Sequence, residues 1–270
     1  MPYADLPGAT LHYETVGRGE PVMLVSGLGG AASYWAPNID AFKARYSVLL
    51  HDHRGTGKSS RSEVEYTVEL MTHDLLGVMD AAGISRAHLV GHSTGGAIGQ
   101  VLAAIAPDRV ASLVLYATWA ELDPQMRMCL EARRRILRAM GEAEYHRATP
   151  IFLYPPYYVR NNWPAIERET AAAAESSPPA SILDSRVTGI MKFDGLQYLD
   201  LIKCPTMILV AEDDILTPPY LSEQIMQRLP AATVVRLPRG GHAVSRTEPA
   251  AFNAAVLQFL ADHAMKEIAA

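Results

Sequence analysis

Short, continuous apolar runs alternate along the chain with segments of helical periodicity. The runs are residues 22–25, 47–50, 88–90, 113–116, 207–210 and 233–235. Runs of this kind are typical of strands that are buried on both faces of a parallel sheet. Between them, apolar residues recur at three- and four-residue steps, for example over residues 70–82 before Gly83. The alternation predicts an α/β fold with a mostly parallel central sheet flanked by helices.

The N-terminal stretch has a different pattern. Residues 9–16 alternate between apolar and polar and end at Gly17-Arg18-Gly19. This pattern predicts a half-exposed strand followed by a turn, in a hairpin at the edge of the sheet.

The alternation of strand and helix stops over residues 119–201. Asp123-Pro124 is typical of a helix start, Pro178-Pro179 is a break, and a further helical stretch begins at Ser181. We expect no strand of the main sheet here. The sequence therefore predicts a helical cap at 119–201, inserted in an α/β core made of residues 1–118 and 202–270.

Composition excludes several classes of function. With 270 residues, 49% of them hydrophobic, and a net charge of −5, the chain is typical of a soluble globular enzyme or binding protein and offers no basic groove for nucleic acid. No apolar run approaches the roughly 20 residues of a membrane span, and the N-terminus lacks the pattern of a secretion signal. The two cysteines, Cys129 and Cys204, favour a reduced compartment. We expect a cytoplasmic protein with a small-molecule substrate and no membrane partner; a homodimer remains open.

Gly91-His92-Ser93-Thr94-Gly95 fits the G-x-S-x-G pattern between an apolar run and a helical segment. This is the strand-turn-helix setting of a nucleophile elbow, in which side chains at Gly91 and Gly95 would collide with the packed turn. The alternative is a glycine-rich turn that merely contains a serine. We predict Ser93 as a nucleophile.

A serine hydroxyl needs a base and a third group that orients the base. His242 follows Gly240-Gly241 after the last predicted strand, from where it can reach the elbow. His51, His53 and His92 are rival bases, whereas the remaining histidines are typical of packing or surface positions. The latter are His12, His73, His146 and His263.

Three candidate acids follow the run at 207–210, at the correct end of a core strand. They are Glu212, Asp213 and Asp214. A second route would place the acid after the strand that ends at Tyr116, at Glu121 or Asp123.

A tetrahedral intermediate needs two backbone N–H donors. The residue after the nucleophile supplies one, Thr94, and the loop Ser26-Gly27-Leu28-Gly29-Gly30 supplies the other through Leu28. A plain turn is the alternative for this loop, and no Lys-Ser/Thr pair follows it as a nucleotide site would require. We find no metal-ligand spacing, and the predicted chemistry needs no cofactor.

Other polar and aromatic residues are candidates for pocket or structural roles. We interpret the turn at 52–59 as structural, with Arg54 tying loops together. Three consecutive arginines on a helix cannot share one face, so most of them should be solvated. Packing without substrate contact is the alternative for each aromatic. The predicted substrate-binding residues are Trp35, Trp119, Arg133, Tyr154 and Tyr157, with Arg134, Arg135 and Tyr158 nearby.

With these residues placed, the chain resembles the α/β-hydrolase superfamily over essentially its whole length. The loop at 26–30 with Tyr34-Trp35, and the segments at 152–155, 202–205 and 240–243, resemble the aminoacrylate hydrolase branch of pyrimidine breakdown. The core also resembles enol-lactonases and carboxylesterases. The resemblance implies the chain order of acid then histidine, Asp214 as the acid four residues before Pro218, and a small acidic substrate.

Together these features predict a serine hydrolase that acts through an acyl-enzyme on a small, acidic carbonyl substrate. The bond could be a carboxylic ester, a lactone or a C–N bond of an amide or enamine, since one triad serves all of these. Serine at position 93 disfavours dehalogenase and epoxide hydrolase chemistry, which use aspartate there. The alternatives are a C–C bond hydrolase and a receptor-like ligand-binding protein with little turnover.

Overall fold

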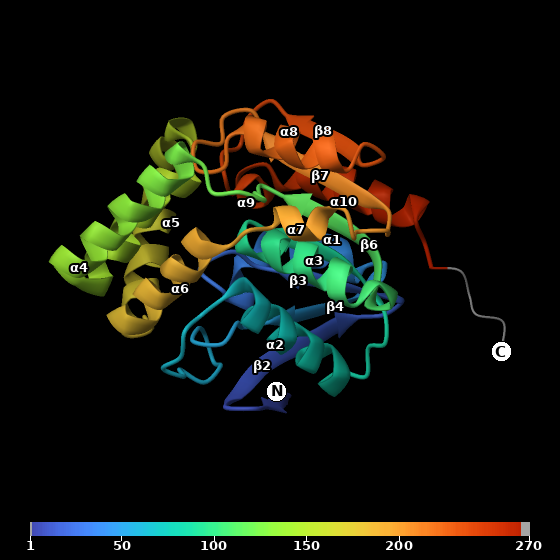
Figure 1. Cartoon of the computed structure of the whole chain (residues 1–270). Helices are drawn as coiled ribbons and strands as arrows, with labels where there is room; N and C mark the ends of the chain where they lie inside the picture. The colour runs from blue at the N-terminus through green and yellow to red at the C-terminus, as the bar shows by residue number, and fades with distance from the viewer. Residues whose placement is uncertain (1, 266–270) are drawn as a thin grey trace.

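The computed structural model describes residues 2–265, and its core is one eight-stranded sheet (Figure 1). The strand order is β1-β2-β4-β3-β5-β6-β7-β8. The strands from β4 to β8 in this order run parallel, whereas β1 and β2 pair antiparallel. The strands are β1 Tyr3–Leu6, β2 Ala9–Gly17, β3 Glu20–Val25, β4 Tyr46–His51, β5 Ala87–His92, β6 Val110–Tyr116, β7 Thr206–Ala211 and β8 Thr233–Leu237.

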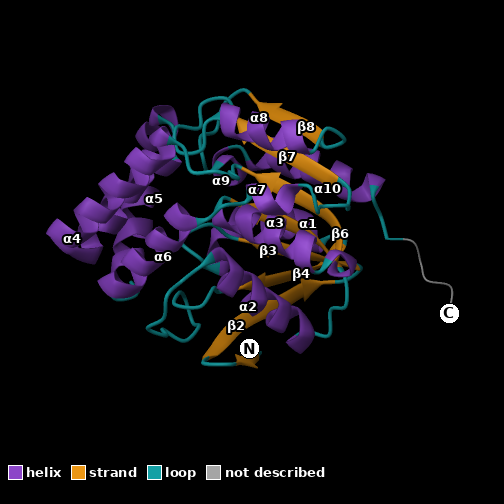
Figure 2. Cartoon of the chain, viewed as in Figure 1, coloured by secondary structure: helices purple, strands orange, loops and turns teal. Residues whose placement is uncertain are grey.

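Helices cover both faces of this sheet (Figure 2). Alternate residues of each central strand enter different cores: Leu89 packs with α2 and α3, and its neighbour Val90 packs with α1 and α10. The apolar runs of the central strands are therefore buried on both faces, as predicted, whereas the run at 233–235 in the edge strand β8 is exposed or half-buried, so the prediction is wrong there. Besides the three long inserted helices described below, the helices are η1 Ala32–Trp35, α1 Ala36–Lys43, α2 Val68–Ala81, α3 Thr94–Ile105, η2 Pro107–Arg109, α7 Leu196–Leu199, α8 Pro219–Arg228, α9 Val244–Thr247 and α10 Pro249–Asp262.

The predicted helical insertion is confirmed. Three long helices stand between β6 and β7 in the chain and lie beyond one end of the sheet (Figure 1). Asp123 caps the first of them by accepting a hydrogen bond from Met126 N at 2.7 Å. The helices are α4 Pro124–Leu153, with non-helical geometry at Gly141, α5 Pro156–Glu175 and α6 Ala180–Lys192. The boundaries between core and cap at 118/119 and 201/202 stay a prediction. Residue 1 and residues 266–270, which the prediction assigns to the core, lie outside the described residues.

The N-terminal hairpin lies at the edge of the sheet, as predicted, and is formed by β1 and β2. The strand expected at 9–16 exists as β2, but it lies between β1 and β4, and β1 forms the edge. The sequence did not indicate β1, because four residues are too few for a pattern of alternation.

Arg54 ties loops to the core as predicted. Its guanidinium donates to both carboxylate oxygens of Asp74, at 2.9 and 2.6 Å, and to the carbonyl of Gly8 at 3.2 Å. Within residues 2–265, no helix combines the length and the apolar character that a membrane span requires.

The parallel strands end at the same edge of the sheet, which faces the inserted helices (Figure 1). The loop at 26–30 follows β3, Ser93 follows β5, Asp214 follows β7, and His242 follows β8. Ligands of open α/β sheets bind at this carboxyl edge, so the fold gathers the predicted site residues where a site belongs.

Candidate active site

Ser93 occupies a strained turn between β5 and α3. Its backbone has φ 53° and ψ −114°, a conformation that non-glycine residues rarely adopt. A methyl group added to Gly91 would overlap the carbonyl of Gly95, and one added to Gly95 would overlap the carbonyl of Val25. The predicted steric need for both glycines is confirmed. The turn places Ser93 directly before α3, as its N-cap residue.

His242 and Asp214 form a buried hydrogen-bonded pair. The imidazole Nδ1 lies 2.9 Å from Asp214 Oδ2, and both side chains are almost fully excluded from solvent. The carboxylate also accepts from the Leu216 and Thr217 amides, at 2.8 and 2.9 Å through Oδ1, and from the Thr217 hydroxyl at 2.8 Å through Oδ2. Four donors hold this carboxylate, so it can fix the ring orientation and the tautomer of His242.

The rival acids have other partners. Asp213 Oδ1 accepts a hydrogen bond of 2.7 Å from the Gly241 amide and so fixes the loop that carries His242. Glu212 pairs with Arg236 at 3.3 Å. Asp123 caps α4, so the geometry places Asp214 alone of these acids on the imidazole.

The rival histidines also have other partners and are not placed as bases. His92 Nε2 donates to the carbonyl of His242 at 3.0 Å, and the Tyr116 hydroxyl donates to the same oxygen at 3.0 Å. His51 and His53 stack on each other with ring centroids 4.9 Å apart. Burial lowers the pKa of His51 to about 4 and that of His92 well below its usual value, which keeps both neutral.

A cavity of about 280 Å³ opens on these residues. Ser93 and His242 both line it, and Ser93 is 7% exposed. No hydrogen bond joins the Ser93 hydroxyl to the imidazole among residues 2–265. Such bonds are often long in structures without a ligand and tighten when a substrate binds.

The glycine loop, defined as residues 26–30, forms one wall of the cavity. Leu28 lies at its centre, where Gly30 N donates to Gly27 O at 3.0 Å and closes a tight turn. Thr94 is the first residue of α3, so its N–H belongs to the helix end that has no intrahelical acceptor. Leu28 therefore lines the same cavity as Ser93, and Thr94 follows Ser93 directly in the chain at the start of α3.

The five predicted substrate-binding residues separate into two groups. Arg133 and Tyr154 line the cavity. Trp35 and Trp119 are fully buried in the two cores on opposite faces of the sheet. Tyr157 donates to Glu248 at 3.0 Å and lies under the guanidinium of Arg239.

Arg133 has an unusual environment for a charged group. Its side chain is 5% exposed, and it donates to the Tyr145 hydroxyl at 2.9 Å and to the Thr149 hydroxyl at 3.3 Å. Its Nε is buried without a hydrogen-bond partner, and no carboxylate within residues 2–265 pairs with it. The helix turns the neighbouring Arg135 outward, where its side chain is 82% exposed, but the Arg134 side chain is only 21% exposed and pairs with Asp184, so the prediction that most of the three arginines are solvated is wrong.

Arg246 is a cavity residue that sequence reasoning missed. It lines the same cavity, and its Nη2 binds both carboxylate oxygens of Glu169 at 2.9 Å. Its position four residues after His242, one helical turn further along, could have indicated it. Among the described residues that line the cavity there are two arginines and no Asp or Glu, and since Glu169 neutralises Arg246, Arg133 is the cavity arginine without a carboxylate partner.

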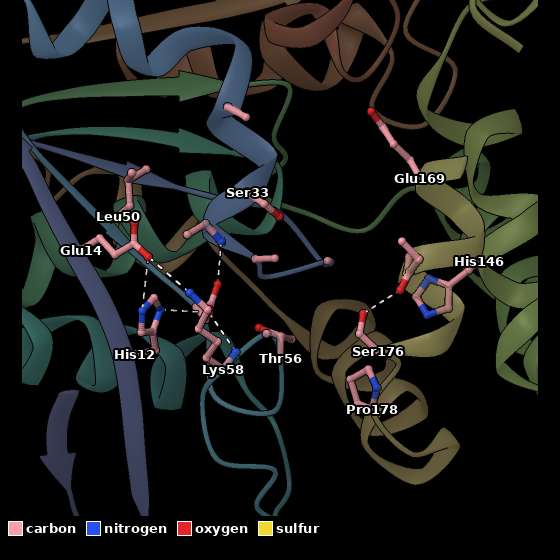
Figure 3. Close-up of a pocket in the computed structure, with 18 of the residues that line it drawn as sticks. His12, Glu14, Ser33, Leu50, Thr56, Lys58, His146, Glu169, Ser176 and Pro178 are labelled. Carbon is pink, nitrogen blue, oxygen red and sulfur yellow. Dashed lines mark hydrogen bonds and ion pairs between the residues drawn. The ribbon is translucent and has the colours of Figure 1, made fainter. Parts of the chain in front are cut away.

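A second, wider pocket of about 660 Å³ adjoins this cavity and shares Arg246 and His146 with it. Figure 3 shows Glu14 and Lys58 on its core side and Glu169 and Ser176 on the opposite side, which belongs to α5. We interpret it as the space through which the inner cavity meets solvent. No grouping of three or more potential metal-binding side chains occurs in the described part of the chain.

Comparisons with known proteins agree with this geometry. A family model described as alpha/beta hydrolase fold matches residues 20–249. A protein of Azorhizobium caulinodans that carries the name carbamate hydrolase RutD is 41% identical over 96% of this chain and 98% of its own. The protein of the same name from Shigella flexneri is 34% identical over 96% of this chain and 93% of its own.

Solved structures give the same result. The enol-lactonase from Burkholderia xenovorans LB400 superposes with a TM-score of 0.88 at 27% identity, over 96% of this chain and 100% of that one. A thermophilic esterase from Thermogutta terrifontis gives 0.85 at 26% identity, over 97% of both chains. These matches confirm the resemblance that the motifs predicted. The chain belongs to the α/β-hydrolase fold family and is a hydrolase of that family.

Proposed function

We propose that this chain is a serine hydrolase that forms an acyl-enzyme with a small, acidic carbonyl compound. The observation that carries the proposal is the buried Asp214–His242 pair, which opens on the same cavity as the strained Ser93. A base with a fixed tautomer that shares a cavity with a hydroxyl at an elbow is the arrangement that nucleophilic acyl transfer requires.

In the first step the Ser93 oxygen adds to the substrate carbonyl while His242 Nε2 takes the hydroxyl proton. Asp214 stabilises the imidazolium, and the Leu28 and Thr94 amides donate hydrogen bonds to the oxyanion. Collapse of the intermediate breaks the bond to the leaving group, which takes the proton from His242. Water then repeats the sequence on the acyl-enzyme, releases the acid and restores Ser93.

The charge of the cavity supports an acidic substrate. A buried guanidinium without a carboxylate partner is unfavourable until an anion neutralises it, and Arg133 is such a group. A carboxylate can accept two parallel hydrogen bonds from a guanidinium. A cavity of about 280 Å³ suits a small molecule. The names of the relatives, a carbamate hydrolase and an enol-lactonase, support C–N, ester and lactone carbonyls as the candidate bonds.

The first test compares the wild type with Ser93→Ala, using p-nitrophenyl acetate turnover and covalent labelling by a fluorophosphonate. We expect turnover to fall by at least about a thousandfold and labelling to disappear. Ser26→Ala is the matched control, because Ser26 lines the same cavity and has no role in the proposed steps. Turnover and labelling that persist in Ser93→Ala would refute the nucleophile, and a wild type inert to both probes would favour a ligand-binding protein.

The second test concerns the substrate charge. With p-nitrophenyl hemisuccinate, Arg133→Gln should raise KM by about 10- to 100-fold, since a charged hydrogen bond contributes roughly 1.5–3 kcal/mol. With neutral p-nitrophenyl acetate the same change should alter KM less than about threefold. The control is Arg135→Gln, on the exposed face of α4. Equal effects on both esters would show that Arg133 does not bind the carboxylate.

The bond that is cleaved can be identified with a panel of small esters, lactones, enamides and ureido acids, with release of ammonia monitored. Release of ammonia or an amine that depends on Ser93 would assign C–N cleavage. Turnover of esters and lactones alone would assign C–O cleavage.

A further inference from the structure

A second buried guanidinium lies beneath the cavity, outside the proposed catalytic steps. Arg186 of α6 is 1% exposed, and no carboxylate within residues 2–265 pairs with it. The nearby carboxylate of Asp74 instead accepts hydrogen bonds from Nε and Nη2 of Arg54. Burial lowers the pKa of Arg186 to about 10, so the group remains charged at neutral pH.

The partners of Arg186 are neutral, and they belong to the core. Nη1 donates to the carbonyl of Arg54 at 2.9 Å, and Nη2 donates to the carbonyl of Leu28 at 3.0 Å. Nη2 also lies 3.3 Å from His53 Nδ1, and the guanidinium lies 5.5 Å from the centroid of the Tyr66 ring. One side chain of the inserted helices therefore joins the glycine loop to the turn after β4.

The contact with Leu28 completes the anchoring of the glycine loop. Gly27 O accepts from Gly30 N at 3.0 Å, and Gly30 O accepts from His53 N at 2.8 Å and from the Thr56 hydroxyl at 3.1 Å. The Leu28 carbonyl is a further acceptor at the tip of the turn, and Arg186 binds it. A methyl group added to Gly30 would lie 2.9 Å from Arg186 Nη2, so the loop and the guanidinium are packed against each other.

Burying this charge is costly, and its neutral partners only partly offset the cost. A leucine or methionine would fill the same space without that cost, but it could not bind two carbonyl oxygens on different loops. The face of α6 that carries Arg186 also carries Leu183 and Ile190, which line the cavity. The guanidinium thus sits directly behind the wall that holds the Leu28 amide.

We infer that Arg186 is a positioning residue of the oxyanion site: by binding the Leu28 carbonyl it fixes the peptide unit between Leu28 and Gly29 and so holds the tight turn, whose preceding peptide unit carries the Leu28 N–H and is closed by the Gly30 N to Gly27 O hydrogen bond. The inference rests on the proposed function, because only that function gives the Leu28 amide a role in binding an oxyanion. A donor must lie within a few tenths of an ångström of its place in the transition state to be fully effective, so the inserted helices contribute to catalysis through this contact.

The test uses Arg186→Met and Arg186→Lys. In Arg186→Met we expect kcat for p-nitrophenyl acetate to fall by about 10- to 100-fold with KM within about twofold, because the loss concerns the transition state. The affinity for phenylboronic acid, which forms a tetrahedral adduct with a reactive serine, should fall in parallel. Arg186→Lys keeps the charge and one carbonyl contact and should recover part of kcat.

A readout that needs no turnover accompanies these measurements. Amide hydrogen exchange of residues 26–30 should accelerate in Arg186→Met, with the exchange of α10 unchanged. The matched control is Arg134→Met, which removes an ion pair between Arg134 and Asp184 within the inserted helices but makes no contact with the glycine loop. It should leave kcat, boronate affinity and loop exchange as in the wild type.

Each outcome decides one question. An active wild type with unchanged kcat and loop exchange in Arg186→Met overturns the inference. A wild type that is inert to the serine probes overturns the proposed function, while faster loop exchange in Arg186→Met would still support the positioning contact. If Arg186→Met does not fold, Arg186→Lys takes its place, and normal kcat and boronate affinity in that variant overturn the inference.

Discussion

At the scale of single residues, two adjacent carboxylates make the assignment of the acid testable. Asp214 Oδ1 accepts from two backbone amides, so in Asp214→Asn the amide oxygen should keep that position and direct its NH₂ group at His242 Nδ1. The imidazole would then accept at Nδ1 and carry its proton on Nε2, where it cannot take one from Ser93. We expect kcat to fall by roughly 10³- to 10⁴-fold in a p-nitrophenyl acetate assay.

Asp213→Asn is the matched control, because it changes the neighbouring carboxylate in the same way. Its oxygen can still accept from the Gly241 amide, so kcat should stay within about threefold of the wild type. A larger loss in Asp213→Asn than in Asp214→Asn would reverse the assignment of the acid.

At the scale of elements, the strand-turn-helix unit around Ser93 depends on close backbone contact. Alanine is favoured over glycine in a helix by about 0.5–1 kcal/mol, so helix propensity alone predicts that Gly95→Ala stabilises α3. The new methyl group would overlap the carbonyl of Val25 in the next strand, and overpacking of this kind costs about 1–3 kcal/mol or more. We expect Gly95→Ala to lower the melting temperature by roughly 3–6 °C in a calorimetric scan, at about 2 °C per kcal/mol for a chain of this length.

Gly29→Ala is the control for that measurement, because its added methyl group would meet no atom within 4 Å. Its melting temperature should stay within about 2 °C of the wild type. Equal melting temperatures for the two variants would contradict the packing argument.

The same elements show how far the sequence alone could lead. Buried parallel strands and the elbow were predictable, because continuous apolar runs and fixed glycine spacing are local signals. The burial of Trp35, Trp119 and Arg186 was not predictable, since it depends on which loops the surrounding elements meet in space. An amphipathic helix such as α6 gives no sign in its own sequence that its arginine will reach the core.

At the scale of the whole molecule, the core keeps several histidines neutral by burying them. Desolvation is the largest cause that lowers the pKa of His51 to about 4, and it also lowers the pKa values of His53 and His92. For His51 the carboxylates of Asp52 and Asp74 oppose this effect, and Arg186 adds to it. In an unfolded chain the same rings would titrate near the ordinary value of about 6.5.

This difference fixes the sign of the dependence of stability on pH. Because the folded-state pKa is depressed, the unfolded chain takes up protons first as the pH falls below about 6.5, so the free energy of unfolding should decrease from there toward pH 4. For His51 alone the decrease between pH 7.5 and 4.5 should be about 2–3 kcal/mol, measured by urea denaturation. His51→Gln should remove that part of the decrease, whereas the exposed His73→Gln should follow the wild type. Identical pH profiles for the wild type and His51→Gln would mean that the core does not hold His51 neutral. The buried end of β4 would then have to accommodate a charged imidazole.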